Sequence, residues 1–317
     1  MINFQNNYRL AIMASVMLLS MAVSVNVAAS IEMVHSYKLA NFNGYLLTQW
    51  GKVYVDRERG ETYVIDRVAR EIKIYNNNGM EVYVFGDTGN LGVAADLTVD
   101  ADGNIIVISR TGTGSEITRC NYRGEPRGKM VLKNLPSEFS YFAPRYIDFR
   151  EGKFYLVDLS DLRIAVTDMN GVFETGYDIA QLLDIPDDKR GENEITGFSV
   201  DADGNMLFTV AVLFQAFRLS PDGELEVFGV PGSAPGAFGV VAGITWDNRG
   251  YIYVTDKLKS AVIVFDKDFN YQTEFGFRGN GPHNLIVPND IDTDGNGNVF
   301  VSQGANRGVS VFRALYK

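Results

Sequence analysis

A pattern of alternating apolar and polar residues recurs six times between Tyr45 and Phe312. In each copy an apolar strand leads through an Asp- or Gly-containing turn to a second strand, and a polar corner then leads to a third. The fifth copy is the clearest, with two strands in Gly243–Asp256, a third in Ala261–Asp266 and a fourth in Tyr271–Gly276. Alternation with a period of two residues predicts β-strands, and helical periodicity is nearly absent after the first 30 residues.

The copies align on the glycine of the turn that joins their first two strands. These glycines are separated by 43, 49, 52, 46 and 47 residues, and they are Gly60, Gly103, Gly152, Gly204, Gly250 and Gly297. Asp, Asn and Gly suit such turns because they tolerate positive φ and their side chains bond the local backbone. A repeat of about 40–50 residues with four short strands is typical of a propeller blade, because one blade cannot bury both faces alone. The sequence therefore predicts an all-β, six-bladed β-propeller.

The last copy lacks a fourth strand, which predicts how the ring closes. We place the blades at about 45–86, 92–128, 143–178, 195–229, 238–276 and 285–313. An apolar strand at 32–39 precedes the first blade and has no partner there. We expect this N-terminal strand to pair with the last blade, because pairing removes an exposed sheet edge. Blades of a closed ring depend on their neighbours, so 30–317 is predicted to be one domain.

The first 29 residues have the pattern of a secretory signal peptide. Arg9 is the only charge before the apolar run Leu10–Val25, and small residues follow up to Ala29. This pattern predicts cleavage between Ala29 and Ser30, and the run is short for a transmembrane helix. We therefore expect a periplasmic or extracellular protein with no membrane insertion after cleavage.

Charge and cysteine content limit the partners. The formal net charge is −10, which argues against nucleic acid and favours a basic partner protein. Cys120 is the single cysteine, so no intramolecular disulfide can form. No nucleophile elbow, P-loop or dinucleotide-binding motif is present in the sequence.

The junctions between the later copies carry a recognisable motif. Residues 228–247 begin Phe-Gly-Val-Pro-Gly-Ser-Ala-Pro-Gly-Ala-Phe-Gly and end Gly-Ile-Thr-Trp-Asp, and residues 275–292 repeat this pattern in diverged form. Both resemble the junctions of NHL-repeat propellers, and the resemblance covers about 45–312. It implies an NHL-type ring. It implies no particular activity, because that family includes scaffolds, binding modules and a few enzymes.

A second resemblance concerns the partner. Segments 239–245, 274–289 and 307–312 look like exported NHL proteins of metal-reducing bacteria. That resemblance implies an accessory role beside another envelope or extracellular protein, with a multihaem c-type cytochrome as one candidate.

One enzymatic alternative stays open. Pro288-Asn289-Asp290 is similar to a Pro-Asn-Gly motif of calcium-dependent lactonases of the six-bladed gluconolactonase type, with Asp in place of Gly. Asn289 and Asp290, with Asp96 at the corresponding position of the second blade, would then be calcium ligands, since calcium prefers oxygen donors. Arg145 occupies that position in the third blade and opposes a cation. The residues favour a protein without catalytic activity and with no cofactor, and they leave the lactonase as the alternative.

Two long connections offer a binding surface. Lys129–Pro144 and Ile179–Glu194 each join the last strand of one blade to the first strand of the next, so both lie on one face of the ring. The first connection and the strand after it contain an aromatic cluster with arginine, a composition enriched at binding hot spots: Tyr141, Phe142, Arg145 and Tyr146. The same aromatic residues could instead pack the connection onto the ring. The sequence thus predicts an exported, non-catalytic scaffold or accessory factor that binds another protein.

Overall fold

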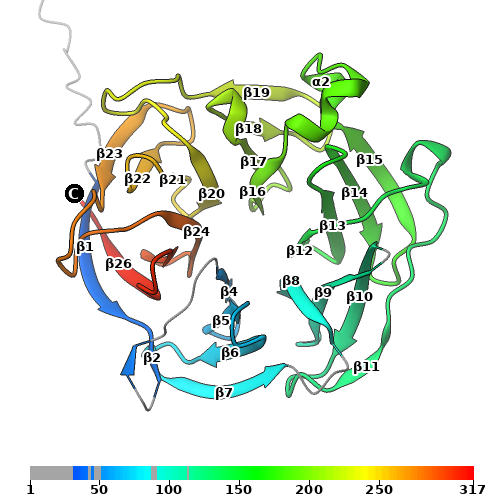
Figure 1. The fold of residues 1–317 in the computed structure, drawn as a ribbon, viewed down its shortest axis with the longest axis horizontal. Helices are drawn as coiled ribbons and strands as arrows, with labels where there is room; N and C mark the ends of the chain where they lie inside the picture. Colours follow the sequence, from blue (N-terminus) through cyan, green and yellow to red (C-terminus); the bar gives the residue numbers. More distant parts are fainter. Residues whose placement is uncertain (1–30, 42–43, 46–50, 87–90, 113) are drawn as a thin grey trace, which may run out of the picture.

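The computed structural model describes residues 31–41, 44–45, 51–86, 91–112 and 114–317, and they form a ring of six four-stranded antiparallel sheets (Figure 1). The predicted six-bladed β-propeller is confirmed. The predicted signal peptide and its cleavage site, Ala29 and Ser30, lie outside the described residues. Among the described residues, no helix is long and apolar enough to cross a bilayer.

The first three blades follow one another along the chain. Blade 1 consists of β4 (Lys52–Asp56), β5 (Glu61–Asp66), β6 (Glu71–Tyr75) and β7 (Glu81–Gly86). Blade 2 consists of β8 (Val93–Val99), β9 (Ile105–Thr111), β10 (Gly114–Cys120) and β11 (Pro126–Lys129). Blade 3 consists of β12 (Tyr146–Arg150), β13 (Lys153–Asp158), β14 (Arg163–Asp168) and β15 (Phe173–Asp178).

The remaining blades complete the ring. Blade 4 consists of β16 (Ile195–Val200), β17 (Met206–Val210), β18 (Gln215–Leu219) and β19 (Leu225–Phe228). Blade 5 consists of β20 (Val241–Trp246), β21 (Ile252–Asp256), β22 (Ala261–Phe265) and β23 (Tyr271–Phe275). Blade 6 consists of β24 (Pro288–Thr293), β25 (Asn298–Gln303), β26 (Val309–Tyr316) and β1 (Ile31–Lys38).

Short elements lie in the connections. β2 (Ala40–Asn41) and β3 (Gly44–Tyr45) pair with each other after β1. The connection between blades 2 and 3 contains the 3-10 turn η1 (Ser137–Phe139), and that between blades 3 and 4 contains α2 (Ile179–Leu182) and η2 (Asp187–Glu192). A further turn, η3 (Ala211–Leu213), joins β17 to β18.

The aspartate-rich turns stabilise the hairpins between the first two strands. In blade 5 the Asp247 Oδ1 atom accepts hydrogen bonds from the backbone N–H groups of Arg249 and Tyr251, at 2.9 and 3.0 Å. Gly250 completes this turn with φ of 84°, a conformation that glycine adopts without steric cost. Asp294 makes the same type of contact to Asn296 and Asn298. These carboxylates therefore bond the local backbone of the turn.

The ring closes through the N-terminal strand, as predicted. β1 pairs antiparallel with β26 from Ile31 opposite Tyr316 to Lys38 opposite Ser310. The register shifts between His35 and Tyr37, so a β-bulge lies at the intervening residue.

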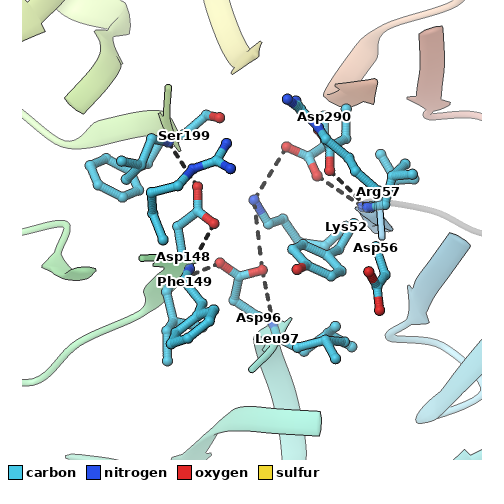
Figure 2. A pocket seen from close by; sticks show the side chains of 18 of the residues that line it. Lys52, Asp56, Arg57, Asp96, Leu97, Asp148, Phe149, Ser199 and Asp290 are labelled. Atoms are coloured by element: carbon cyan, nitrogen blue, oxygen red, sulfur yellow. Dashed lines mark hydrogen bonds and ion pairs between the residues drawn. The ribbon is translucent and has the colours of Figure 1, made fainter. Parts of the chain in front are cut away.

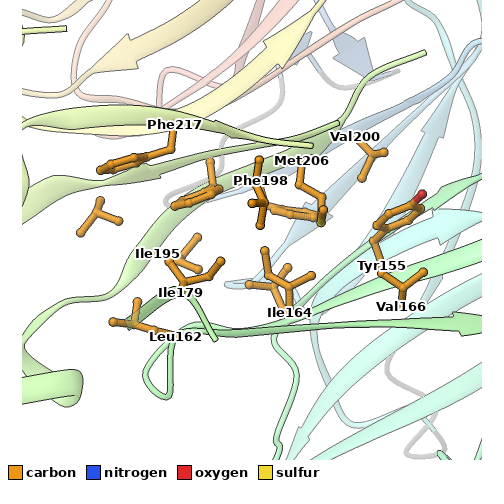
Figure 3. Close-up of a cluster of buried hydrophobic side chains, with 14 of the residues drawn as sticks. Tyr155, Leu162, Ile164, Val166, Ile179, Ile195, Phe198, Val200, Met206 and Phe217 are labelled. Atoms are coloured by element: carbon orange, nitrogen blue, oxygen red, sulfur yellow. The ribbon is translucent and has the colours of Figure 1, made fainter. Parts of the chain in front are cut away.

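Apolar side chains fill the spaces between neighbouring blades. Figure 3 shows the cluster between blades 3 and 4, where Phe217, Met206, Ile164 and Val166 are buried. Cys120 is buried in the corresponding cluster between blades 1 and 2, and burial raises the pKa of its thiol to about 11. The six sheets are thus joined by continuous packing.

Candidate functional site: the central channel

The first strands of the blades surround a central channel that contains a cavity of about 110 Å³ (Figure 2). Binding sites for drug-sized molecules usually enclose ~300–1,000 Å³. The channel is therefore too small for most organic substrates.

A buried ammonium group lies at the centre of the channel. The Lys52 Nζ atom is 3.3 Å from Asp290 Oδ1, 3.8 Å from Asp96 Oδ1 and 4.2 Å from the centroid of the Tyr146 ring. Figure 2 shows Lys52 between these two carboxylates. Burial lowers the pKa of Lys52, but the Asp290 and Asp96 carboxylates outweigh this effect and raise the pKa overall. Lys52 therefore stays charged at neutral pH.

The carboxylates also connect neighbouring blades. The innermost strands of adjacent blades are not paired as a sheet, so their backbone N–H groups need other acceptors. In four places an aspartate of one blade accepts a hydrogen bond from an N–H of the next, at 2.8–3.0 Å: Asp96 from Ile147, Asp148 from Val200, Asp290 from Val53 and Asp292 from Val55. These aspartates are structural cross-links around the axis.

Burial raises the pKa of three of these aspartates, Asp96, Asp148 and Asp292, and brings the first two close to neutral pH. It raises the pKa of Asp96 to about 7, although Lys52 and the Ile147 N–H act in the opposite direction. It also raises the pKa of Asp148 to about 6 against the Val200 N–H. Both groups therefore exchange protons near neutral pH.

Two arginines and a tryptophan line another part of the cavity. The guanidinium carbons of Arg57 and Arg150 lie 4.1 and 5.0 Å from the Trp246 ring centroid. Arg57 donates hydrogen bonds to the carbonyl oxygens of Trp246 and Thr293, at 2.9 and 3.0 Å, and is 3.6 Å from Asp292. Arg57 thus joins blade 1 to blades 5 and 6.

On the side of blades 4 to 6 the inner strands approach each other closely. A Cβ atom at Gly197 would lie 2.1 Å from the Ala242 carbonyl oxygen, and one at Gly243 would lie 2.8 Å from the Asp290 Cα atom. Only glycine fits at such distances, so the ring is tightly closed here.

The predicted calcium ligands do not fit calcium. Calcium takes about six to eight oxygen ligands. Here both Asp96 oxygens and one Asp290 oxygen accept backbone N–H groups, and the Lys52 ammonium occupies the space between them. Asn289 does not line the cavity. Within the described ranges, no group of three or more His, Cys, Asp or Glu residues is arranged to hold a metal ion.

The structure separates the other predicted site residues. Tyr146 joins the channel, where its hydroxyl donates to the Thr196 carbonyl oxygen at 3.1 Å. Tyr141 is 91% exposed, whereas Phe142 packs against Phe139 and the core between blades 2 and 3. Arg145 is half-buried. Asp96, Asp290 and Tyr146 therefore meet around Lys52, and Tyr141, Phe142, Arg145 and Asn289 do not.

Sequence reasoning missed the lysine at the centre. Lys52 is the first residue of β4, ahead of the turn glycine on which the copies align. The available signal was a charged residue one strand position before Val53-Tyr54-Val55, on the same side of the strand as Tyr54.

Comparisons with known proteins support the architecture. A family described as a 6-bladed beta-propeller matches residues 237–307, and no curated protein matches the chain. A solved protein of unknown function from Bacteroides thetaiotaomicron is 14% identical, with a TM-score of 0.65 over 90% of this chain and 77% of that one. An auxiliary nutrient binding protein from Bacteroides ovatus is 13% identical, with a TM-score of 0.61 and the same coverage.

An enzyme shares the fold as well. A catalytically inactive virginiamycin B lyase from Staphylococcus aureus, solved with quinupristin, is 14% identical, with a TM-score of 0.57 over 83% of this chain and 80% of that one. At these identities the likeness concerns the fold alone. The chain is a six-bladed β-propeller, and its assignment to the NHL-repeat family stays a prediction.

Proposed function

We propose that the protein is an exported, non-catalytic propeller that binds a partner protein of the bacterial cell envelope. This proposal rests on one observation in the central channel. Its ionisable groups bond neighbouring blades to one another, and the cavity between them has a volume of about 110 Å³. The calcium-dependent lactonase is not favoured, because an ammonium group stands where the metal would be. The partner protein would therefore bind to the outer surface of the ring.

The connection between blades 3 and 4 is the strongest candidate surface. Between residues 184 and 194 it exposes five acidic side chains and one basic one: Asp184, Asp187, Asp188, Glu192, Glu194 and Lys189. Its other base, Arg190, is buried and bonds Asp178 at 2.7 and 2.8 Å and Asp187 at 2.8 Å. This buried arginine fixes the connection, so the acidic groups are presented on a rigid support.

The partner should be basic. Complementary charge accelerates association and weakens with salt, since the Debye length is about 8 Å at physiological ionic strength. Tyr141, on the neighbouring connection of the same face, offers an exposed aromatic ring. A c-type cytochrome with a basic patch is the partner that we propose.

Charge reversal tests the surface. We expect Asp184→Lys with Asp188→Lys to reduce recovery of haem-containing protein from envelope extract at low salt by at least tenfold, because repulsion replaces attraction. The matched control is Asp203→Lys with Asp222→Lys, two exposed aspartates in turns on the opposite face. Recovery of no haem protein by the wild type would refute the cytochrome. An equal loss in both double variants would refute the surface.

A further inference from the structure

A second pocket lies at the outer edge of blade 6, far along the chain from the acidic connection. It is a hollow of about 530 Å³ that opens to solvent, and it lies between the closing strand β1, the connection from β23 to β24 and the turn from β25 to β26. This volume is within the usual range for small-molecule sites, roughly 300–1,000 Å³. The β-bulge after His35 lies in its wall, and bulges commonly redirect side chains next to functional sites.

The pocket is basic, although the chain as a whole is acidic. His35, Lys38 and Arg307 line it, and no acidic side chain is found among the described residues of its wall. The Lys38 Nζ atom donates to the Arg307 carbonyl oxygen at 3.4 Å. Burial lowers the pKa of Lys38, and the positive charge of Arg307 lowers it further. Lys38 and Arg307 thus place two positive charges in the wall of one pocket.

The arginine is held in a fixed orientation by the glycine-rich connection. Its Nη1 and Nη2 atoms donate to the carbonyl oxygens of Asn280, Gly281 and Asn284, at 3.1–3.4 Å. Its buried Nε atom has no hydrogen-bond partner in the described part of the chain, and the same holds for His35 Nε2. Two nitrogen atoms of the residues that line one pocket are therefore unsatisfied, which is uncommon for buried polar groups.

We propose that this pocket binds a small organic anion through its carboxylate or phosphate oxygens. Lys38 and Arg307 supply the charge, and the Asn280–Gly281 backbone forms the opposite wall. The inference is independent of the partner surface, because it concerns different residues and a different class of ligand.

Anion titration tests the pocket. We expect inorganic phosphate or citrate to bind one site saturably by calorimetry, and the tighter of the two will identify the oxyanion group. Lys38→Gln should weaken that binding at least tenfold. Ser36→Asp, which adds a carboxylate at the exposed bulge, should weaken it similarly. Lys189→Gln, at an exposed lysine of another connection, is the matched control and should leave the affinity unchanged.

A proton NMR readout links binding to the pocket itself. The chain has two histidines, so two C2 proton signals are expected, and His283→Asn assigns them. Burial, Lys38 and His283 lower the pKa of His35, and Arg307 also faces the pocket. A bound anion should raise the His35 pKa, because it stabilises the charged imidazole. The proposal is overturned if neither anion binds saturably, if Lys38→Gln and Lys189→Gln behave alike, or if the His35 pKa does not move.

Discussion

Asp148 shows how one buried carboxylate affects stability in two opposing ways. It accepts hydrogen bonds from the N–H groups of Val200 and Phe149, both at 2.8 Å, and so connects blade 3 to blade 4. Its ionised form is nevertheless poorly solvated, and burial raises its pKa to about 6. The residue therefore stabilises the ring by its position and destabilises it by its charge.

This balance predicts a pH dependence of unfolding. The folded-state pKa of Asp148 is above the unfolded value of ~3.9, so protons favour the folded state. Its contribution is most favourable below pH 4 and is lost as pH rises through 6. Asp148→Asn should therefore remove about 1 kcal/mol of the fall in unfolding free energy between pH 5 and pH 8.

Denaturant titrations of both proteins at several pH values check this prediction. The difference between the two curves of unfolding free energy against pH gives the contribution of Asp148. His35 contributes to both proteins alike, and its lowered pKa makes stability rise with pH. Parallel stability curves for the two proteins would show that Asp148 is charged in the same pH range when folded and unfolded.

At the scale of single elements, β1 closes the ring by pairing with β26. It covers the edge of β26, and the buried residues Ile31 and Leu39, at and just beyond its two ends, enter two different apolar clusters. Removing β1 would expose both clusters and a sheet edge of eight residues.

Deletion of Glu32–Leu39 should therefore cause aggregation or lower the melting temperature by more than 10 °C, since several kcal/mol of burial are lost. Thermal denaturation followed by circular dichroism measures the effect. Val34→Thr, at an exposed position of the same strand, is the control and should change little. A deletion variant as stable as the control would mean that the axis alone holds the ring closed.

Most strands could be predicted, because the residue types within each strand and its flanking turns determine them. Strands such as β21 and β22 combine β-branched residues with aspartate–glycine turns, and the missing fourth strand of blade 6 predicted the role of β1. The bulge after His35 and the ion pairs of Lys52 could not be predicted, because they depend on contacts between residues that are distant in sequence. Asp96 and Asp290 line the channel, and the Lys52 ammonium group lies beside them.

At the scale of the whole molecule, two sets of contacts close the ring, one at its outer edge and one at its axis. The outer closure is β1 on β26, and the inner closure is formed by contacts between blades 6 and 1 at the axis. Arg57 adds to the inner closure through Trp246 and Thr293.

Arg57→Met should lower the unfolding free energy by about 2–4 kcal/mol, because buried carbonyl groups and Asp292 lose their partner. Unfolding should stay a single cooperative transition by fluorescence and circular dichroism, since no blade is independent. Arg59→Met removes a more exposed arginine from the same turn and should cost less than 1 kcal/mol. Separate transitions for the two probes would indicate that the blades unfold individually.

The outer closure also determines how the protein would respond to mechanical force. Ile31 lies opposite Tyr316 in an antiparallel pair, so both ends of the folded ring leave from the same point. A force that pulled the two ends apart would break this residue pair first and then each following pair of β1 and β26 in sequence. Hydrogen bonds that break one at a time resist little load. Tension would therefore peel β1 away and dismantle the basic pocket at His35 and Lys38 before it reached any other blade.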